Sequence, residues 1–151
     1  GRHVCWNATS AGAQAEGSAI MNSGYLLDTS AFIWWLSDHR RLSVDARRLI
    51  LDGANPVWLS AASIWEMAIK VSLGKLRVPG NLDDLVETQT RANGLQVLDI
   101  RARHASATMS LPPIHNDPFD RMLIAQAQSE NLVLLTPDSL IAQYPGVRVV
   151  W

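Results

Sequence analysis

Four carboxylates stand where the sequence places the end of a strand or the start of a helix. Asp28 and Asp138 follow short apolar runs, and Glu66 and Asp120 lie near the starts of two amphipathic segments. In an open α/β sheet, ligands bind outside the carboxyl ends of the strands. Carboxylate oxygens are hard ligands that suit Mg²⁺ or Mn²⁺. The positions of these four acids therefore predict a metal site.

Glu66 and Asp138 also have purely structural interpretations. Ser63 and Glu66 match a capping box, in which Glu66 would only satisfy a backbone N–H, although this helix could equally begin at Ser60. Asp138 could simply cap the turn that leads into residues 139–141. Neither acid proves a site by itself.

The segment around Asp120 reads in the same two ways. Asp117 is a good N-cap, Pro118 suits the first helical position, and Asp120 in the first turn complements the helix dipole. Asp120 shares a helix face with Ile124 and Ala127, so we expect its side chain to border packed surface. We therefore predict that Asp117 is the cap and that Asp120 belongs to the site.

Asp28 is the hardest acid to explain as a structural residue. An acid that follows an apolar strand at the centre of a sheet is costly to remove from water without a partner. No basic residue is adjacent to Asp28 in the sequence. A metal ion would provide the missing charge, and it would also explain how several carboxylates gather despite their repulsion.

Short apolar runs alternate with helical patterns from residue 24 onward. This alternation predicts parallel strands joined by helical crossovers, in a three-layer α/β/α sandwich with a mainly parallel, about five-stranded sheet. The expected strands are residues 25–28, 57–60, 95–98, 132–136 and 147–150. The expected helices are residues 31–36, 44–52, 62–73, 82–92, 101–110 and 119–129.

Composition and length indicate one ordinary globular domain. The chain has 151 residues, of which 48% are hydrophobic and 18% charged, and its net charge is -1. Roughly 68–70% of the unfolded surface of such a chain can be buried. No apolar tract reaches the length of a membrane span, so we expect no membrane contact. The net charge gives no general attraction for nucleic acid, so any such partner must be held locally.

The first 23 residues differ from the rest of the chain. They are rich in Ala, Gly and Ser, show no periodicity, and lack the apolar core of a signal peptide. We interpret residues 1–23 as a disordered, cloning-derived or upstream segment, with Met21 as a natural start, and residues 24–151 as the domain. Cys5 cannot form an internal disulfide, which suits a cytoplasmic location.

The arrangement resembles the PIN-domain nucleases, and within them the VapC-type ribonuclease toxins of bacterial toxin–antitoxin pairs. The resemblance covers about residues 25–151, and several segments carry it in order. They are Leu26–Ala31, Ser60–Lys70, His115–Ala127, Leu135–Asp138 and the closing strand Val149–Trp151. The family fold places the first and fourth strands side by side, which would bring Asp28 close to Asp138.

The resemblance also implies an activity. Asp28, Glu66, Asp120 and Asp138 would take the places of the family's acidic quartet, and the reaction would be Mg²⁺-dependent hydrolysis of RNA phosphodiesters, with Mn²⁺ as a substitute. Asp28 and Asp120 would be the principal metal ligands, and Glu66 would bind a second ion or orient water. Asp138 would act through a bound water.

Further residues receive accessory roles. Asp117, Thr29 and Thr136 would support the ligands from outside. Lys70, Arg121 and His115 are candidate RNA contacts, as are Lys75 and Arg77, although Lys70 would also form an ion pair with Glu66 four residues earlier, and a lone loop histidine is more often structural. Trp34, Trp35, Trp58 and Trp65 fall in apolar patterns, which favours the core or a subunit interface over base stacking.

Three classes of function remain open at this point. The first is the ribonuclease toxin, with a homodimer or larger assembly, a VapB-type antitoxin whose C-terminal segment covers the acids, and DNA contacts only through that antitoxin. The second is a metal-dependent phosphatase or phosphotransferase, but no second acid stands two residues after Asp28. The third is a non-catalytic PIN-like interaction module, which the retention of all four acids argues against.

Overall fold

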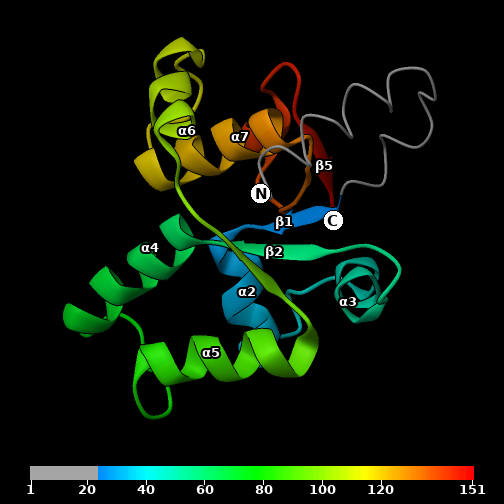
Figure 1. The fold of residues 1–151 in the computed structure, drawn as a ribbon, viewed down its shortest axis with the longest axis vertical. Coiled ribbons are helices and arrows are strands. Elements are labelled where there is room, and N and C mark those ends of the chain that lie inside the picture. Colours follow the sequence, from blue (N-terminus) through cyan, green and yellow to red (C-terminus); the bar gives the residue numbers. More distant parts are fainter. Residues whose placement is uncertain (1–23) are drawn as a thin grey trace.

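A computed structural model describes residues 24–151 of the chain as alternating strands and helices around one sheet (Figure 1). Residues 1–23 lie outside the described residues, and the expected boundary of the domain lies at their edge. Both interpretations stay predictions. The strands are β1 (Tyr25–Leu27), β2 (Val57–Ser60), β3 (Gln96–Leu98), β4 (Val133–Leu135) and β5 (Arg148–Val150). The helices are α2 (Thr29–Leu36), α3 (Val44–Leu51), α4 (Ala61–Ser72), α5 (Leu82–Asn93), α6 (Ala102–Ala107), η2 (Thr108–Ser110), α7 (Pro118–Glu130) and α8 (Ser139–Ala142).

The sheet is parallel throughout, in the order β3-β2-β1-β4-β5. The strand order reverses beside β1, because β2 and β3 extend the sheet on one side and β4 and β5 extend it on the other. At this switch point Leu27 pairs in register with Leu135. The residues that follow β1 and β4 therefore emerge next to each other, as the resemblance to PIN domains implies.

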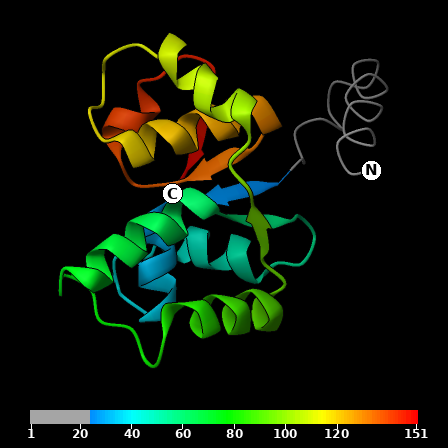
Figure 2. The ribbon, with the colours of Figure 1, turned by 60° about the vertical axis from the view of Figure 1, so that its left-hand side comes forward.

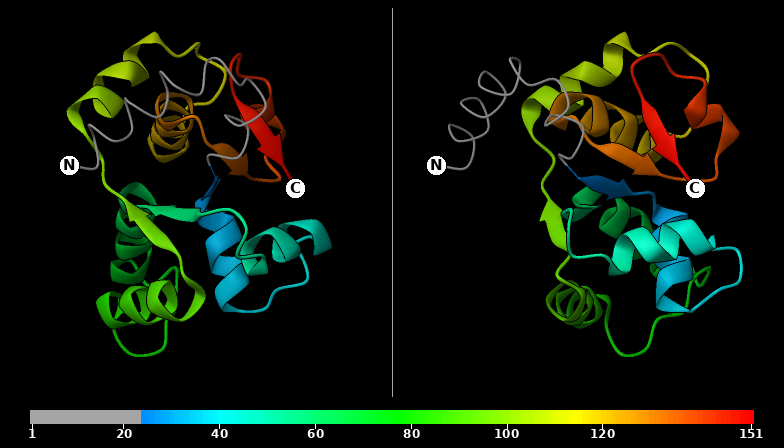
Figure 3. Two further views of the ribbon diagram at one scale, coloured as in Figure 1. Left: turned by 45° about the vertical axis from the view of Figure 1, so that its right-hand side comes forward. Right: turned by 90° about the vertical axis from the view of Figure 1, so that its right-hand side faces the viewer.

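Helices cover both faces of the sheet, which confirms the three-layer sandwich. In Figures 1 and 2, α6 and α7 lie on one side of the sheet, and α2, α3, α4 and α5 lie on the other. The two views in Figure 3 show the same separation from further angles. Buried Leu27 and Leu135 face the α2 side, whereas Leu26 and Leu134 face the α7 side. Successive strand residues thus anchor two hydrophobic cores, one on each face.

Some elements differ from their predicted extents. Helix α4 begins after Ser60, whose side chain accepts a hydrogen bond from the Ala62 amide, so Ser63 and Glu66 do not form a capping box. The expected helix 101–110 is divided into α6 and the short 3₁₀ helix η2. The turn after Asp138 continues as the short helix α8, which the sequence pattern is too brief to reveal.

The tryptophans are less buried than expected for core residues. Trp34, Trp35 and Trp58 are partly buried against the two cores, but Trp65 is 60% exposed. In the part of the chain that the structure describes, no helix combines the length and apolar character needed to cross a membrane.

Candidate metal centre

Asp28 and Asp138 meet at the switch point of the sheet, and each caps a helix. One Asp28 oxygen, Oδ1, accepts a hydrogen bond from the Ala31 amide at 2.6 Å. Its other oxygen accepts one from the Thr136 hydroxyl, also at 2.6 Å. The same hydroxyl oxygen accepts from the Asp138 amide at 3.1 Å, so Thr136 joins the two strand ends. These contacts support the accessory position predicted for Thr136.

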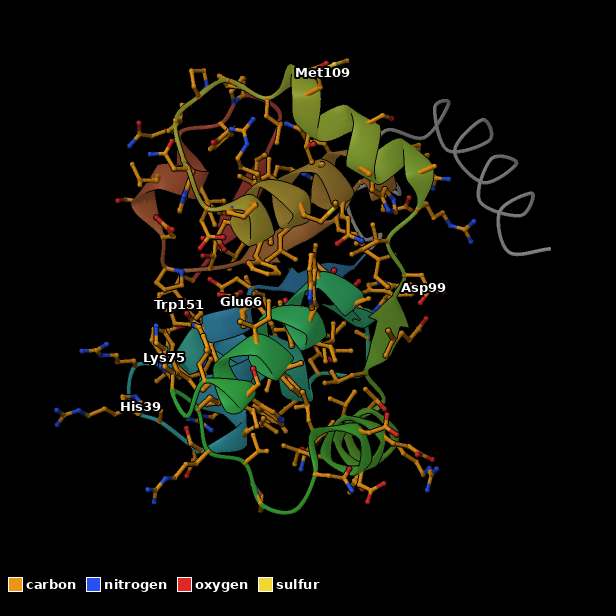
Figure 4. The ribbon with its side chains drawn as sticks, turned by 90° about the vertical axis from the view of Figure 1, so that its left-hand side faces the viewer. His39, Glu66, Lys75, Asp99, Met109 and Trp151 are labelled. Atoms are coloured by element: carbon orange, nitrogen blue, oxygen red, sulfur yellow. The ribbon has the colours of Figure 1, made fainter. Side chains whose placement is uncertain are left out.

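Glu66 reaches the site from the interior of α4. Its Oε1 atom is buried and accepts no hydrogen bond from residues 24–151. Its Oε2 atom lies 3.4 Å from the Lys70 ammonium, which matches the expected ion pair between residues four positions apart. Figure 4 shows Glu66 at the boundary between the α4 layer and the layer above it. Burial of a carboxylate oxygen without a hydrogen-bond donor costs folding free energy and is rare in proteins, and a bound cation would offset that cost.

Helix α7 supplies the remaining acids at its N-terminus. Asp117 is the N-cap, and its side chain accepts from the amides of Phe119 and Asp120. Pro118 occupies the first helical turn, as the sequence predicts. The Asp120 side chain lies in that turn and takes no part in the cap.

His115 lies among these acids. Its Nε2 atom is 2.9 Å from Asp138 Oδ2 and 3.1 Å from Asp120 Oδ2. One ligand atom each from His115, Asp120 and Asp138 fall within 4.8 Å of one another, a spacing that could hold an ion. The sequence predicts His115 as an RNA contact or a structural residue, and not as a neighbour of these acids, because the fold rather than sequence spacing brings them together.

The electrostatics of the site follow from burial and crowding. Burial raises the pKa of Asp28 to about 6, and repulsion from Asp138 and Glu66 adds to the shift. Burial raises the pKa of Asp120 to about 7, with further repulsion from Asp117, Glu66 and Asp28. All four predicted acids therefore lie close enough to affect one another. Their oxygen donors, the raised pKa values of Asp28 and Asp120, and the unpaired Glu66 oxygen fit a divalent cation.

Two of the other predicted residues have structural partners. Thr29 donates its hydroxyl to Ser63 Oγ at 3.0 Å, which ties α2 to α4 beneath the acids. The Arg121 guanidinium donates to the backbone carbonyls of Thr108, Leu111, Pro112 and His115. Arg121 therefore braces the loop before α7, and its contact with RNA stays a prediction.

Tyr144 is a residue that the sequence does not single out. Its hydroxyl accepts a hydrogen bond from the His115 amide at 2.7 Å. It also lies 3.3 Å from an Arg121 nitrogen. No local signal could reveal this role, since Tyr144 lies 29 residues from His115 in the sequence.

Comparison with protein families gives one match over most of the domain. Residues 25–147 match the PIN domain family. A curated relative, Ribonuclease VapC16 of Mycobacterium tuberculosis, is 38% identical over 72 residues, which are 45% of this chain and 51% of that protein. The chain thus spans about half the length of the curated relative that it matches.

Solved structures share the fold. VapBC2 from Rickettsia felis, solved bound to a DNA fragment from its promoter, superposes with a TM-score of 0.65 and 17% identity, over 84% of this chain and 98% of that chain. A toxin-antitoxin complex from Klebsiella pneumoniae gives a TM-score of 0.56 and 22% identity, over 85% and 97%. FitAcB from Neisseria gonorrhoeae gives 0.58 and 20%, over 84% and 96%. At these identities the likeness establishes the fold.

Proposed function

The chain belongs to the PIN-domain family, and from that premise we propose that it is a metal-dependent endoribonuclease that acts as the toxin of a toxin–antitoxin pair. One observation carries the proposal. Four carboxylates from separate elements converge at the switch point, and the pKa values of Asp28 and Asp120 are raised to about 6 and about 7. The curated relative is named a ribonuclease, and one of the solved structures with this fold is a toxin–antitoxin complex, which supports the same function.

We propose that Asp28, Asp120 and Glu66 hold Mg²⁺, with Mn²⁺ as a substitute. A bound divalent ion supplies Lewis-acid activation of the phosphodiester and of an attacking water. Asp28 is oriented by hydrogen bonds at both oxygens. Glu66 presents its unpaired Oε1 atom, and Asp120 extends from the first turn of α7. These three carboxylates would bind the cation and so orient the phosphodiester and the attacking water.

The sequence argues against the phosphotransferase alternative. Asp28 would then be the nucleophile, and the second acid expected two residues later is absent, because position 30 holds Ser30. We therefore propose water, rather than Asp28, as the nucleophile, with a 5′-phosphate and a 3′-hydroxyl as the product ends. A phosphorylated Asp28 in a quenched reaction would contradict this choice.

The proposed partners are RNA, a VapB-type antitoxin and a second copy of the chain. Helix α4 carries a stripe of exposed apolar side chains, Trp65 at 60%, Ile69 at 36% and Leu73 at 61%. Trp65 also packs edge-on against Phe119, next to Asp120. A contiguous apolar surface beside a polar site is typical of protein contacts. This α4 stripe supports an assembly, and contact with DNA would come only through the antitoxin.

The variant Asp120→Asn tests the function. If Asp120 is a ligand, this change abolishes Mg²⁺-dependent cleavage, and it raises the melting temperature of the metal-free protein by roughly 3–10 °C, because a buried and repelled charge is removed. If Asp120 only complements the helix dipole, the change costs about 0.3–1 kcal/mol and leaves cleavage intact. Cleavage of a defined RNA and thermal melts in chelator, on one preparation, measure both effects.

Asp45→Asn is the matched control for this experiment. Asp45 also lies in the first turn of a helix, α3, but its side chain is 66% exposed and paired only with Arg48 at 3.4 Å. The control should keep full cleavage and an almost unchanged melting temperature. Retained cleavage in Asp120→Asn, with a melting temperature lowered as in a lost helix charge, would remove Asp120 from the site.

A further inference from the structure

His115 is held in place by contacts on both sides of its peptide unit. Its amide donates to the Tyr144 hydroxyl at 2.7 Å, and its carbonyl accepts from Arg121 at 3.3 Å. The side chain is only 15% exposed. These contacts within the protein therefore hold the imidazole in one position in the acidic site.

The hydrogen bonds of the ring determine where its proton lies. Nδ1 accepts a hydrogen bond from the Asp117 amide at 3.1 Å. A ring nitrogen that accepts from an N–H carries a lone pair, so in the neutral imidazole the proton is on Nε2. That Nε2–H is hydrogen-bonded to Asp138 Oδ2 at 2.9 Å, and Asp120 Oδ2 lies 3.1 Å from the same nitrogen. The imidazole is thus a donor to Asp138 with a second carboxylate oxygen beside it.

The same hydrogen bonds argue against His115 as a metal ligand. A histidine that binds a metal through one nitrogen almost always donates the N–H of the other nitrogen to an acceptor. Here the other nitrogen, Nδ1, faces the Asp117 N–H, which is a donor. Coordination through Nε2 would require two N–H groups to face each other, or the ring to leave its present position. The close group of His115, Asp120 and Asp138 is therefore better described as two carboxylates and one hydrogen-bond donor.

We propose that His115 is a positioning residue, whose Nε2–H holds the Asp138 carboxylate by a hydrogen bond and lies against the Asp120 carboxylate, so that both keep the arrangement that receives the metal. The proposal rests on the proposed metal-dependent function. It also explains how Asp138, which caps α8 with its Oδ1 atom, keeps its Oδ2 atom directed into the site. An outer contact of this kind typically changes metal affinity by about 10–100-fold when it is removed.

The first test needs no metal. In the metal-free protein at neutral pH, ¹⁵N NMR of the imidazole should show the Nε2–H tautomer for His115. The Nδ1–H tautomer would overturn the proposal, because the ring could then not donate to Asp138. This measurement is independent of cleavage, so it can decide against His115 while the proposed function stands.

The second test compares Mn²⁺ binding of wild type, His115→Leu and His115→Gln. Leucine removes the donor and should weaken binding by about 10–100-fold, whereas the glutamine amide can reach the Nε2 position and should restore binding to within about threefold. Electron spin-echo spectra of bound Mn²⁺ should show no directly coordinated nitrogen. A coordinated nitrogen that disappears in His115→Leu would overturn the proposal, and so would unchanged affinity in that variant.

His39→Leu is the matched control. His39 Nδ1 accepts from the Arg41 amide at 3.1 Å, the same local turn as at His115, but its ring stacks on Trp34 and lies away from the acids. The control should bind Mn²⁺ like wild type. If it lost affinity as much as His115→Leu, the effect would be one of loop stability and the proposal would fail. If wild type itself bound no Mn²⁺, the proposed function would fail, and the tautomer result would still decide the role of His115.

Discussion

Two acids of the candidate site use one carboxylate oxygen to cap a helix and keep the other for the site. Asp28 caps α2 with Oδ1, and Asp138 caps α8 with Oδ1. The second oxygen of each side chain is turned into the site, toward Thr136 or His115. The structural and the functional interpretations of these residues are therefore compatible, because a carboxylate has two oxygens and the cap needs only one.

The raised pKa values predict how pH affects the metal-free protein. Burial raises the pKa of Asp28 to about 6 and that of Asp120 to about 7, both from an ordinary value of 3.8. A raised pKa means that the folded state binds the proton more tightly than the unfolded state. This stabilisation is complete below the ordinary value and is lost as the pH rises through 6 and 7. The free energy of unfolding should therefore increase as the pH is lowered from 8 to 5.

Thermal melts in chelator between pH 5 and 8 measure this dependence. Asp28→Asn and Asp120→Asn should each flatten the curve, because each removes one of the titrating groups. Added Mn²⁺ should reverse the trend, since the metal binds the deprotonated carboxylates and its stabilising effect grows with pH. A melting temperature that falls steadily from pH 8 to pH 5 in chelator would contradict the crowding of these acids.

At the scale of elements, the sequence predicts the strands well and the helix boundaries less well. Each expected strand is found within about one residue, because buried parallel strands are short, continuous apolar runs. The start of α4 was ambiguous because Ser60 and Ser63 are both good caps. The structure uses Ser60, whose hydroxyl also donates to Gln126 Oε1 at 2.5 Å in the opposite layer. Such a contact between residues 66 positions apart has no local signal.

The candidate site shows the same limit. The four acids could be found from their places at strand ends and helix starts, and from the resemblance to PIN domains. The contributions of His115 and Tyr144, and the backbone contacts of Arg121, depend on how the loop before α7 packs against the turn after α8. These contacts join segments that are distant in sequence, so neither spacing nor periodicity could predict them.

Helix α7 and the preceding loop form one unit that is held together by Arg121. Arg121→Leu would leave several partly buried carbonyls without a donor, at a cost of about 1–3 kcal/mol for each group that stays unpaired. We expect a total loss of about 2–4 kcal/mol and a weaker metal affinity, because the loop carries His115. Denaturant unfolding and Mn²⁺ titration measure the two effects.

Arg91→Leu is the control for this brace. Arg91 forms an exposed ion pair with Glu87, four residues earlier on α5, and its side chain is 76% exposed. Removal of such a pair costs under about 0.5 kcal/mol. Arg121→Lys should recover only part of the stability, because a single ammonium cannot replace the fork of the guanidinium. Equal stability of the Arg121 and Arg91 variants would show that the loop does not need the brace.

At the scale of the whole molecule, the negative site and an exposed apolar surface lie near each other, and a protein inhibitor could bind both. The acids form a negative site at the switch point, while the α4 stripe of Trp65, Ile69 and Leu73 offers apolar contact nearby. The chain as a whole has a net charge of only -1, so the negative field is local. A partner that binds by apolar contact on α4 or another helix can therefore direct a cation into the site.

The proposed antitoxin should insert an arginine among the carboxylates. A planar guanidinium can pair with two carboxylate oxygens at once, and it would compete with the metal for Asp28, Glu66 and Asp120. Replacement of this arginine by alanine should weaken inhibition of RNA cleavage by about 10–1,000-fold, because a truncated partner of a buried charge pair typically costs 2–5 kcal/mol. Inhibition constants for wild-type and variant antitoxin measure the effect.

A double-mutant cycle can show that the arginine acts through the acids. Toxin Asp120→Asn removes one acceptor, so the antitoxin variant should lose less affinity for this toxin than for wild type, with a coupling of about 0.5–3 kcal/mol. Toxin Asp83→Asn, an exposed change on α5, should show no coupling. Affinity can be measured without RNA, so loss of cleavage in Asp120→Asn does not affect the result. An antitoxin that inhibits fully without placing any cation among the acids would refute this mode. In such a complex the pKa values of Asp28 and Asp120 would stay raised, since no positive charge would lie near them.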